Sequence, residues 1–290
     1  MDEFFIQQLC LIGVGSIGGS LACALRKAGV VKEIVGVGRN IENLKRAVQL
    51  GVIDRYEQDL QKAVVSADMV VLAVPLGAME SIFKSIAPCL NKNTILTDVG
   101  SAKGSVVQAA VNVFETLPPN LVPAHPIAGT EKSGVEAAFA ELFNARRIII
   151  TPTAVSDKHA VLQVRSMWEA CGAEVIEMDV EHHDEVLAAT SHLPHMLAYT
   201  LVDTLARMDD SQEIFDYAAG GFRDFTRIAS SDPQMWHDIC LANHVALVKV
   251  LERFSSELKE LTEAVQRNDS DYLKAMFSRA KRARDTFCNK

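Results

Sequence analysis

Short apolar stretches and helical patterns alternate along the first 180 residues of this 290-residue chain. Predicted strands occur at residues 8–12, 34–37, 69–74, 94–99, 121–124, 147–151 and 173–178. The run at 69–74 is continuously apolar and is followed by Pro75, as is typical of a parallel strand buried on both faces. Apolar residues at helical spacing occur between the predicted strands at residues 17–28, 41–50 and 160–171. Strands that alternate with helices predict an α/β domain with a doubly wound parallel sheet.

Only helical spacing continues after residue 179. Long amphipathic patterns cover residues 181–207, 233–265 and 270–286, and a segment rich in Gly, Ser and Asp at 217–232 is expected to connect them. We therefore predict two domains, residues 1–179 and an all-helical domain at residues 180–290. Long helices in so small a domain favour burial of their apolar faces against a second copy, so we expect a homodimer.

Composition narrows the class of protein. The net charge of −8 and the lack of a basic stripe argue against a nucleic-acid partner. No apolar run approaches the roughly 18 residues of a membrane span. The six cysteines include no C-x-x-C pair and the first residues lack a basic signal-peptide start, so we expect free thiols and a cytoplasmic location.

A glycine-rich turn follows the first apolar run. Gly13, Gly15 and Gly18 form a G-x-G-x-x-G pattern between a predicted strand and a predicted helix. The first glycine permits the tight turn, the second lets a pyrophosphate approach and the third lets helix and strand pack closely. This context predicts a Rossmann-type dinucleotide site. The residues expected to contact the dinucleotide are Gly13, Gly15, Ser16, Ile17, Gly18, Arg39, Val74, Pro75 and Ser101.

The choice between NAD and NADP stays open. The second strand of such a domain normally ends in an acidic residue that holds the ribose 2′-hydroxyl of NAD. Gly38 and Arg39 stand at this point instead. Arg39 is suited to stack on adenine or to pair with a 2′-phosphate, which would permit NADP, and the alternative is a solvated loop residue.

The run from His125 to Gly134 carries candidate chemistry. Its Pro126 and small residues favour a loop, which would present the imidazole of His125, the hydroxyl of Thr130 and the carboxylate of Glu131 to a ligand. A surface loop without function is the alternative.

Ser101 follows the run at 94–99, at the edge of the sheet where ligands bind. It is a candidate for ligand contact, and the alternative is that it caps the next helix.

Two histidines on the first long helix share a face. His192 and His195 are three residues apart, and Pro194 between them disturbs the backbone ladder. The lack of an H-E-x-x-H pattern argues against a metal, so we expect substrate contact. The neighbouring His182 and His183 begin a charged helical turn, which predicts solvated side chains.

Arginines in the connector are candidates to bind a carboxylate. Arg223 and Arg227 are four residues apart in a glycine-hinged segment of an acidic protein. The alternative is a surface ion pair of Arg227 with Asp224, which would contribute little. Trp236 and His237 further along are expected to serve mainly in packing.

Together these motifs resemble the prephenate/arogenate (cyclohexadienyl) dehydrogenase family of tyrosine biosynthesis. The matching segments, in chain order, are GVGSIGGSL, DVGSAKG, HPIAGTEKSG, SHLPH and GFRDFTRIASSDPQMW. The resemblance covers nearly the whole chain and implies a Rossmann domain followed by a helical dimerisation domain. It also implies oxidative decarboxylation of prephenate to 4-hydroxyphenylpyruvate, or of arogenate to tyrosine, with hydride transfer to NAD(P)+.

The resemblance assigns roles to individual residues. The catalytic histidine of the HP-x-AG motif corresponds to His125, and the serine that contacts nicotinamide and substrate hydroxyl corresponds to Ser101. The remaining residues that it places at the substrate are Thr130, Glu131, His192, His195, Arg223, Asp224 and Arg227, of which Arg227 binds a carboxylate. The departure is Gly38, where many NAD-using members carry Asp.

Two other functions fit parts of the pattern. A β-hydroxyacid dehydrogenase has the same order of domains but uses a helical lysine, and no matching motif surrounds Lys249 or Lys259. A non-catalytic NAD(P)H-binding sensor would not need Ser101, His125 and Arg227 together.

Overall fold

The computed structural model describes residues 4–129 and 132–288. The chain forms two compact units, residues 1–244 and residues 245–290. The first unit contains every candidate site residue that the structure describes.

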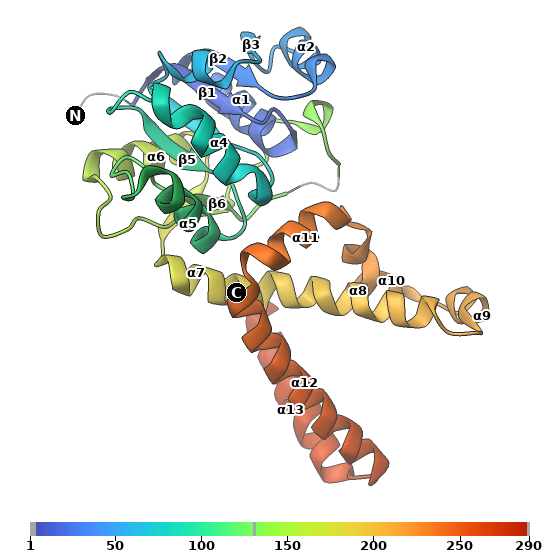
Figure 1. Ribbon diagram of the computed structural model, residues 1–290. Coiled ribbons are helices and arrows are strands. Elements are labelled where there is room, and N and C mark those ends of the chain that lie inside the picture. Colours follow the sequence, from blue (N-terminus) through green and yellow to red (C-terminus); the bar gives the residue numbers. More distant parts are fainter. Residues whose placement is uncertain (1–3, 130–131, 289–290) are drawn as a thin grey trace. The chain divides into compact units, whose positions relative to one another are not determined.

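The first unit is built around a five-stranded parallel sheet (Figure 1). Its strands are β1 (Ile6–Ile12), β2 (Val31–Val37), β3 (Arg55–Glu57), β4 (Met69–Leu72) and β5 (Ile95–Asp98). Their order is β3-β2-β1-β4-β5, so the chain leaves β1 toward one side and later returns to its other side at β4. The carboxyl ends of β1 and β4 therefore flank the switch point at which such sheets bind ligands.

Helices cover both faces of this sheet, as the sequence predicts. They are α1 (Ser16–Ala28), α2 (Ile41–Gln49), α3 (Leu60–Val64), α4 (Met79–Ile86), α5 (Lys103–Phe114) and α6 (Lys158–Ala170). Leu9 and Leu11 of β1 pack in the core with α1 and α6, whereas Cys10 and Ile12 pack with α3, α4 and α5. Because successive strand residues point to opposite faces, a continuous apolar run gives a strand buried on both sides.

A second, three-stranded sheet continues from the first. It consists of β6 (Ala124–Pro126), β7 (Arg147–Ile150) and β8 (Glu174–Glu177), with β6 antiparallel to β7. The segment that leads into β6 runs parallel to β5, where Leu121 bridges Leu96. The sheets are therefore not parallel throughout, and the strand expected at residues 121–124 is shifted toward His125.

The first predicted long helix carries a π-helical turn. It comprises α7 (Val180–Leu187), the π turn η4 (Ala188–His192) and α8 (Leu193–Ala206). Pro194 has no backbone N–H and cannot continue the α-helical ladder, so a wider turn precedes it. Thr190, on this turn, donates its hydroxyl hydrogen to the carbonyl oxygen of Val186 at 2.7 Å.

Two expectations for the helical segment are wrong. The stretch at 217–232 is not a simple connector, because it contains α10 (Gly220–Thr226) and the 3₁₀ turn η5 (Arg227–Ser230). The helix expected at 233–265 is broken into α11 (Pro233–Ala242) and α12 (His244–Gln266). Asn243 leaves helical geometry at the break, and its side chain bonds elsewhere in the fold.

The remaining short elements of the first unit are α9 (Ser211–Asp216) and the 3₁₀ turns η1 (Leu76–Ala78), η2 (Ala87–Cys89) and η3 (Val135–Ala137).

The second unit consists of α12 from residue 245 onward and α13 (Ser270–Cys288). Asn268 adopts a left-handed φ of 52° in the turn between them, and Asp269 caps α13 by accepting from the amide of Tyr272 at 3.0 Å. Large apolar side chains exposed on these two helices are Val245, Val248, Leu258, Val265, Phe277 and Phe287. Among the described residues, none of the helices is long and apolar enough to span a bilayer.

Candidate active site

The turn at residues 13–18, here called the glycine turn, joins β1 to α1. Gly13 has a φ of +100°, and a Cβ there would lie 2.1 Å from the carbonyl oxygen of Ala73. A Cβ on Gly18 would lie 2.3 Å from the carbonyl oxygen of Gly13. Both positions therefore require glycine, because a side chain would collide with backbone atoms.

The glycine turn fits the pyrophosphate of a dinucleotide. A Cβ on Gly15 would meet no atom within 4 Å, so this side of the turn is open. Gly15 is also the N-cap of α1, whose first turn has no acidic residue, and the helix dipole there favours an anion. Val74 and Pro75 follow β4 beside the turn, with the Val74 Cγ1 atom 3.0 Å from the Cβ that Gly13 lacks.

The end of β2 gives no steric reason for glycine at residue 38. A Cβ on Gly38 would make ordinary contact with Leu44 at 3.4 Å. Arg39 beside it is exposed. A larger residue therefore fits at position 38, and this end of β2 carries a cation without a carboxylate.

His125 is a strand residue, so the expectation of a loop at this position is wrong. It lies in β6, pairs with Ile149 of β7 and is only 9% exposed. Strand pairing fixes the backbone and holds the imidazole more firmly than a surface loop would. Thr130 and Glu131, from the same sequence motif, lie outside the described residues.

His183 is fully buried against His125, so the expectation that it is solvated is wrong. His125 Nδ1 and His183 Nε2 are 2.9 Å apart, within hydrogen-bond distance, and the two rings meet edge to face. The Nδ1 atom of His183 lies 2.8 Å from the Oδ1 atom of Asp184. These three residues form a continuous series of contacts from β6 to α7, which we call the histidine chain.

Asp184 ends the histidine chain at the beginning of α5. Its two carboxylate oxygens accept hydrogen bonds from the backbone amides of Lys103 and Gly104, each at 2.8 Å. The N-cap residue of α5 is Ala102, so the alternative that Ser101 caps this helix is wrong. A carboxylate eighty residues further along the chain caps the helix, and Ser101 stays half-buried just before it.

A buried ion pair links β5, α5 and β6. The ammonium group of Lys103 donates to the Oδ2 atom of Asp98 and, at 2.7 Å, to the carbonyl oxygen of Ala124. The amide of Ala124 donates to the other oxygen of Asp98 at 3.2 Å. Removing either charge would leave the other buried and unpaired, which is strongly destabilising. This pair holds the residue before His125 in place.

The environment keeps both imidazoles of the histidine chain neutral. Burial lowers the pKa of His125 well below 6.5, and the nearby His183, Lys103 and His192 lower it further. Burial also lowers the pKa of His183, although its hydrogen bond to Asp184 acts in the opposite direction. A neutral imidazole can accept a proton or a hydrogen bond, which an imidazolium cannot.

His192 is also buried and neutral, and it has an unused nitrogen. Burial lowers its pKa to about 4. The side-chain amide of Asn243 donates to the carbonyl oxygen of Asp184 at 2.8 Å and to the Nδ1 atom of His192 at 3.2 Å. The proton of neutral His192 is therefore on Nε2, which has no partner among the described residues. A buried donor without a partner is the kind of group that a ligand satisfies.

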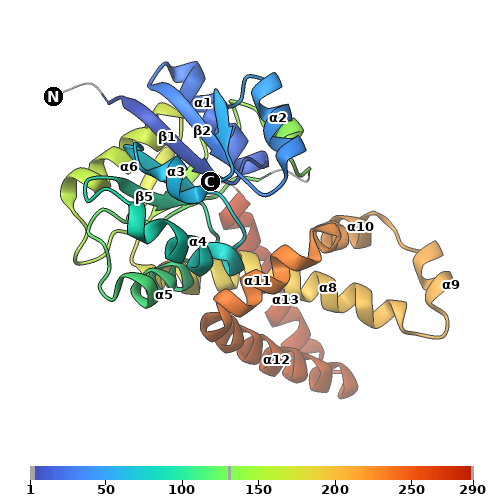
Figure 2. The ribbon, with the colours of Figure 1, turned by 45° about the horizontal axis from the view of Figure 1, so that its top comes forward.

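His195 and Arg227 lie together beside α11. The ring of His195 stacks on Trp236 with centroids 3.7 Å apart. The turn η5, which begins at Arg227, packs against α8, which carries His195. Burial lowers the pKa of His195, and the charge of Arg227 lowers it as well. Tyr199 ties α8 to this region through a 2.6 Å bond to the carbonyl oxygen of Ser231. Accordingly, α8 and α11 lie side by side (Figure 2).

The structure thus brings most of the predicted residues to one edge of the sheet. Asp98, directly before the segment that carries Ser101, touches the residue before His125. His183 contacts His125, and His192 is close enough for its charge to lower the pKa of His125. Arg223 and Asp224 are exposed on α10. Sequence reasoning missed His183, Asp184 and Lys103.

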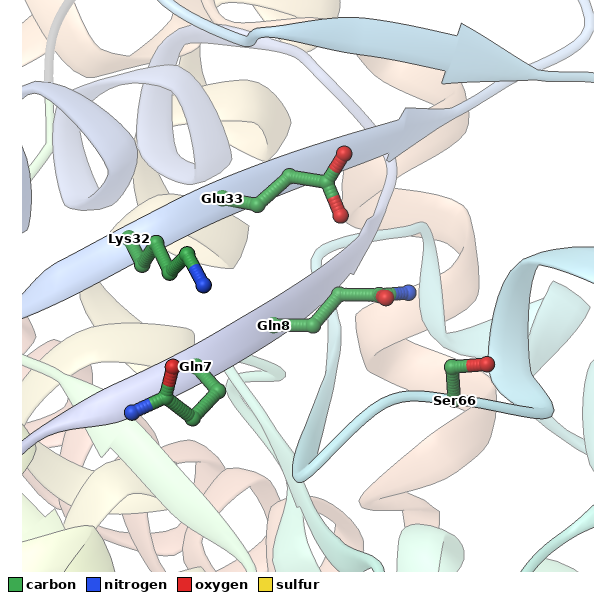
Figure 3. Close-up of a pocket in the computed structure, with 5 residues that line it drawn as sticks. All are labelled: Gln7, Gln8, Lys32, Glu33 and Ser66. Carbon is green, nitrogen blue, oxygen red and sulfur yellow. The ribbon is translucent and has the colours of Figure 1, made fainter.

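A polar hollow lies at the opposite edge of the sheet (Figure 3). Gln7, Gln8, Lys32 and Glu33 line it from the first residues of β1 and β2, together with Ser66 before β4. These are the amino ends of parallel strands, whereas ligands bind at the carboxyl ends in this type of sheet. The hollow is therefore separate from the candidate active site.

Family models account for most of the chain. The nucleotide-binding domain of prephenate dehydrogenase matches residues 21–177, and the prephenate dehydrogenase dimerization domain matches residues 179–279. The chain belongs to the prephenate dehydrogenase family. The resemblance and the fold class expected from the sequence are thereby confirmed.

Individual relatives agree with this assignment. Cyclohexadienyl dehydrogenase of Zymomonas mobilis is 40% identical over 283 residues, which are 96% of this chain and 95% of the relative. Prephenate dehydrogenase of A. aeolicus, solved with hydroxyphenyl propionate and NAD+, has a TM-score of 0.90 at 40% identity and covers 96% of this chain and 97% of its own. Arogenate dehydrogenase of Synechocystis has a TM-score of 0.82 at 27% identity, with 97% and 100% covered.

This prephenate dehydrogenase family member is therefore an NAD(P)-dependent oxidoreductase. The family assignment removes the β-hydroxyacid dehydrogenase alternative. The two family models meet between residues 177 and 179, whereas the compact units of the structure divide at residue 244.

Proposed function

We propose that this enzyme catalyses the oxidative decarboxylation of prephenate to 4-hydroxyphenylpyruvate and of arogenate to tyrosine. The observation that carries the proposal is the buried, neutral imidazole of His125, held at the same carboxyl edge of the sheet as the glycine turn. Hydride loss from a carbon that bears a hydroxyl is assisted by a base at that edge, which accepts the hydroxyl proton while the carbonyl forms. Bound NAD(P)+ supplies the hydride acceptor.

His125 is the proposed base of the reaction. Its neutral ring accepts a hydrogen bond from the C4 hydroxyl of the substrate and takes the proton as the carbonyl forms. Ser101, on the segment between β5 and α5, contacts the same hydroxyl and the nicotinamide. Loss of the C1 carboxylate as CO2 makes the ring aromatic, and the resulting phenolate oxygen takes the proton back from His125. The driving force belongs to the substrate, so the protein mainly positions the reacting groups.

The substrate carboxylates bind on the helical side of the site. Arg227 is the proposed bidentate partner of one carboxylate, because its planar guanidinium presents two parallel N–H donors. The Nε2–H group of His192 and the ring of His195 complete this side. The further proposed substrate contacts are Thr130, Glu131, Arg223 and Asp224.

We propose that both NAD+ and NADP+ are accepted. Residues 38–40, which follow β2, include no carboxylate that would repel a 2′-phosphate, and Arg39 is exposed there. Arg39→Ala should raise the KM for NADP+ by about tenfold, the loss expected for one charge-assisted contact, and should change the KM for NAD+ less. Equal effects on both cofactors would remove Arg39 from the 2′-phosphate site.

The active enzyme is proposed to be a homodimer of chains with a nucleotide-binding domain at 1–179 and a helical domain at 180–290. Exposed apolar side chains on α12 and α13, together with the match to a dimerization domain, support this assembly. The six free cysteines support a cytoplasmic location.

Turnover measurements test the proposed function. Purified protein is given prephenate or arogenate with NAD+ or NADP+, and formation of the reduced cofactor is followed. Turnover is expected with at least one pairing, and the four kcat/KM values rank the substrates and cofactors. Cofactor binding without turnover in any pairing would overturn the proposal and favour a non-catalytic NAD(P)H sensor.

A further inference from the structure

The histidine chain has a role that follows from the direction of its hydrogen bonds. We propose that Asp184 and His183 are positioning residues that hold His125 in the tautomer with its proton on Nδ1, so that Nε2 is the accepting atom. This inference rests on the proposed function for its catalytic meaning. The tautomer itself is a property of the protein without substrate.

The direction is set at Asp184. The amides of Lys103 and Gly104 donate to its two oxygens, and they belong to the first turn of the twelve-residue helix α5. The positive end of a helix favours a carboxylate over a carboxylic acid. Burial alone would raise the pKa of Asp184, but the hydrogen bonds from His183 and from the two amides lower it overall. Asp184 is therefore ionised and can only accept.

His183 transmits this constraint to the next contact. Because Asp184 only accepts, the Nδ1 atom of His183 must carry a proton and donate it at 2.8 Å. Its ring is neutral, since burial lowers its pKa. The Nε2 atom of a neutral ring protonated on Nδ1 has a lone pair and no hydrogen. This atom can only accept a hydrogen bond.

His125 then has one compatible form. Its Nδ1 atom lies 2.9 Å from the accepting Nε2 atom of His183, so Nδ1 must carry the proton. The Nε2 atom of neutral His125 then has a lone pair and no hydrogen. Other ionisable groups that influence His125 are Lys103 and His192, and both disfavour its protonated form. The ring therefore stays neutral, with its lone pair on Nε2.

The backbone makes this arrangement persistent. His125 is fixed by strand pairing in β6, and His183 and Asp184 occupy adjacent positions on α7. Asn243 holds the carbonyl oxygen of Asp184 from the end of α11. A base that already has the correct tautomer needs no proton rearrangement before it accepts the substrate hydroxyl proton. The wrong tautomer would present an N–H group to that hydroxyl and could not act as the base.

Nitrogen NMR of the full chain tests the tautomer directly. Histidine is labelled with ¹⁵N, and long-range proton–nitrogen correlations distinguish the protonated from the bare nitrogen of each neutral ring. The chain has eight histidines, and spectra of His125→Asn and His183→Gln identify the two rings. We expect Nδ1–H on both rings in the wild-type protein near neutral pH. A proton on Nε2 of either ring would overturn the proposal.

Two substitutions at His183 separate positioning from simple packing. Gln in place of His183 can turn its amide NH2 toward Asp184 and its oxygen toward His125, so the Nδ1–H tautomer of His125 should persist. Leu offers no acceptor, so the two tautomers of His125 should mix. Expected kcat values are within about twofold of wild type for His183→Gln and lower by about 5–10-fold for His183→Leu, because only the fraction of His125 with its lone pair on Nε2 can act as the base. The KM for substrate should stay within about threefold in both.

A neighbouring histidine gives the matched control. His182→Leu changes the exposed residue directly before His183 and should leave kcat and the His125 spectrum unchanged. Equal kcat values for His183→Gln and His183→Leu, with both folded, would show that His183 only fills space. Failure of the proposed function is distinguishable, because wild-type protein would then show Nδ1–H on His125 but no turnover of prephenate or arogenate.

Discussion

The glycine turn and the histidine chain make up the proposed reaction site but are built from different parts of the chain. The glycine turn offers backbone atoms to the proposed cofactor, and Gly13 and Gly18 must lack side chains because a Cβ would collide with backbone. The histidine chain works through side chains of β6 and α7, whose carboxylate end is held by two backbone amides of α5. The glycine turn depends on the absence of side chains from a few adjacent residues. The histidine chain depends on polar side chains from residues that are far apart in the sequence.

This difference predicts different consequences of substitution. A change in the glycine turn should alter cofactor binding or folding and leave the chemistry of the base untouched. A change in the histidine chain should alter kcat and leave cofactor binding unchanged. Cofactor binding and kcat therefore report on the two regions separately.

The largest expected effect is on kcat at His125. His125→Asn should lower kcat by about 10²–10⁴-fold, the usual effect of removing a positioned base, while the cofactor Kd stays within about twofold. Steady-state kinetics and cofactor titration measure the two quantities. His237→Asn, at an exposed position on α11, is the control. Full kcat in His125→Asn would mean that another group takes the proton.

Alanine substitutions at two positions of the glycine turn should have different effects, one on stability and the other on cofactor binding. Gly13→Ala should lower the free energy of unfolding by about 2–5 kcal/mol, because a positive φ and a collision with the Ala73 carbonyl add strain. Gly15→Ala should leave the melting temperature within a few degrees but weaken cofactor binding at least tenfold, because its Cβ would occupy the open side of the turn. Unchanged cofactor affinity in Gly15→Ala would place the pyrophosphate elsewhere.

Arg227 is the proposed partner of a substrate carboxylate, so its loss should affect substrate binding. Arg227→Ala should raise the KM for prephenate by about 10–100-fold, in keeping with the roughly 1.5–3 kcal/mol of a hydrogen bond to a charged group. Arg227→Lys should recover part of this loss, since it keeps the charge without the planar fork. Arg253→Ala, on the exposed surface of α12, controls for nonspecific charge effects. A KM unchanged by loss of the guanidinium would exclude Arg227 from the carboxylate site.

The smallest expected effect is a decrease in the free energy of unfolding at acidic pH. His192 has a pKa of about 4 in the folded protein, because of burial, and about 6.5 when unfolded. The unfolded chain therefore binds the proton more readily, so stability is complete above pH 6.5 and is lost as pH falls below it. We expect this residue to contribute a loss of about 1 kcal/mol between pH 6.5 and 5.5.

Denaturation of His192→Gln at both pH values checks this contribution. Glutamine does not titrate, so the variant should lose about 1 kcal/mol less than wild type over the same interval. An identical loss in the two proteins would mean that His192 does not carry this pH dependence.

The contrast between the two regions also explains which parts of the structure could be predicted from the sequence alone. The glycine turn was predictable because its signal is local: three glycines at fixed spacing between a strand and a helix. The parallel sheet was predictable for the same reason, since continuous apolar runs indicate strands buried on both faces. Both predictions depend on residues that are neighbours in the chain.

The histidine chain was not predictable in this way. His125 and His183 are 58 residues apart, and a charged helical turn gives no sign that His183 is buried. The only local signal is Asp184 directly after His183, a carboxylate placed to orient an imidazole. Likewise, the break between α11 and α12 occurs at Asn243, whose side chain bonds to Asp184 and His192. The helical spacing of apolar residues gives no sign of these bonds. Long-range polar contacts override local spacing at these positions.

The π turn between α7 and α8 has a consequence for the phase of the helix. An α-helix advances about 100° per residue, so a turn that accommodates one extra residue rotates everything after it by about that angle. His192 lies at the end of this turn and His195 one turn beyond it. Deleting one residue from Ala188–Thr190 would restore a regular helix and turn both imidazoles away from Asn243 and Trp236. The irregularity is thus a spacer that sets the angular position of His192 and His195 relative to His183.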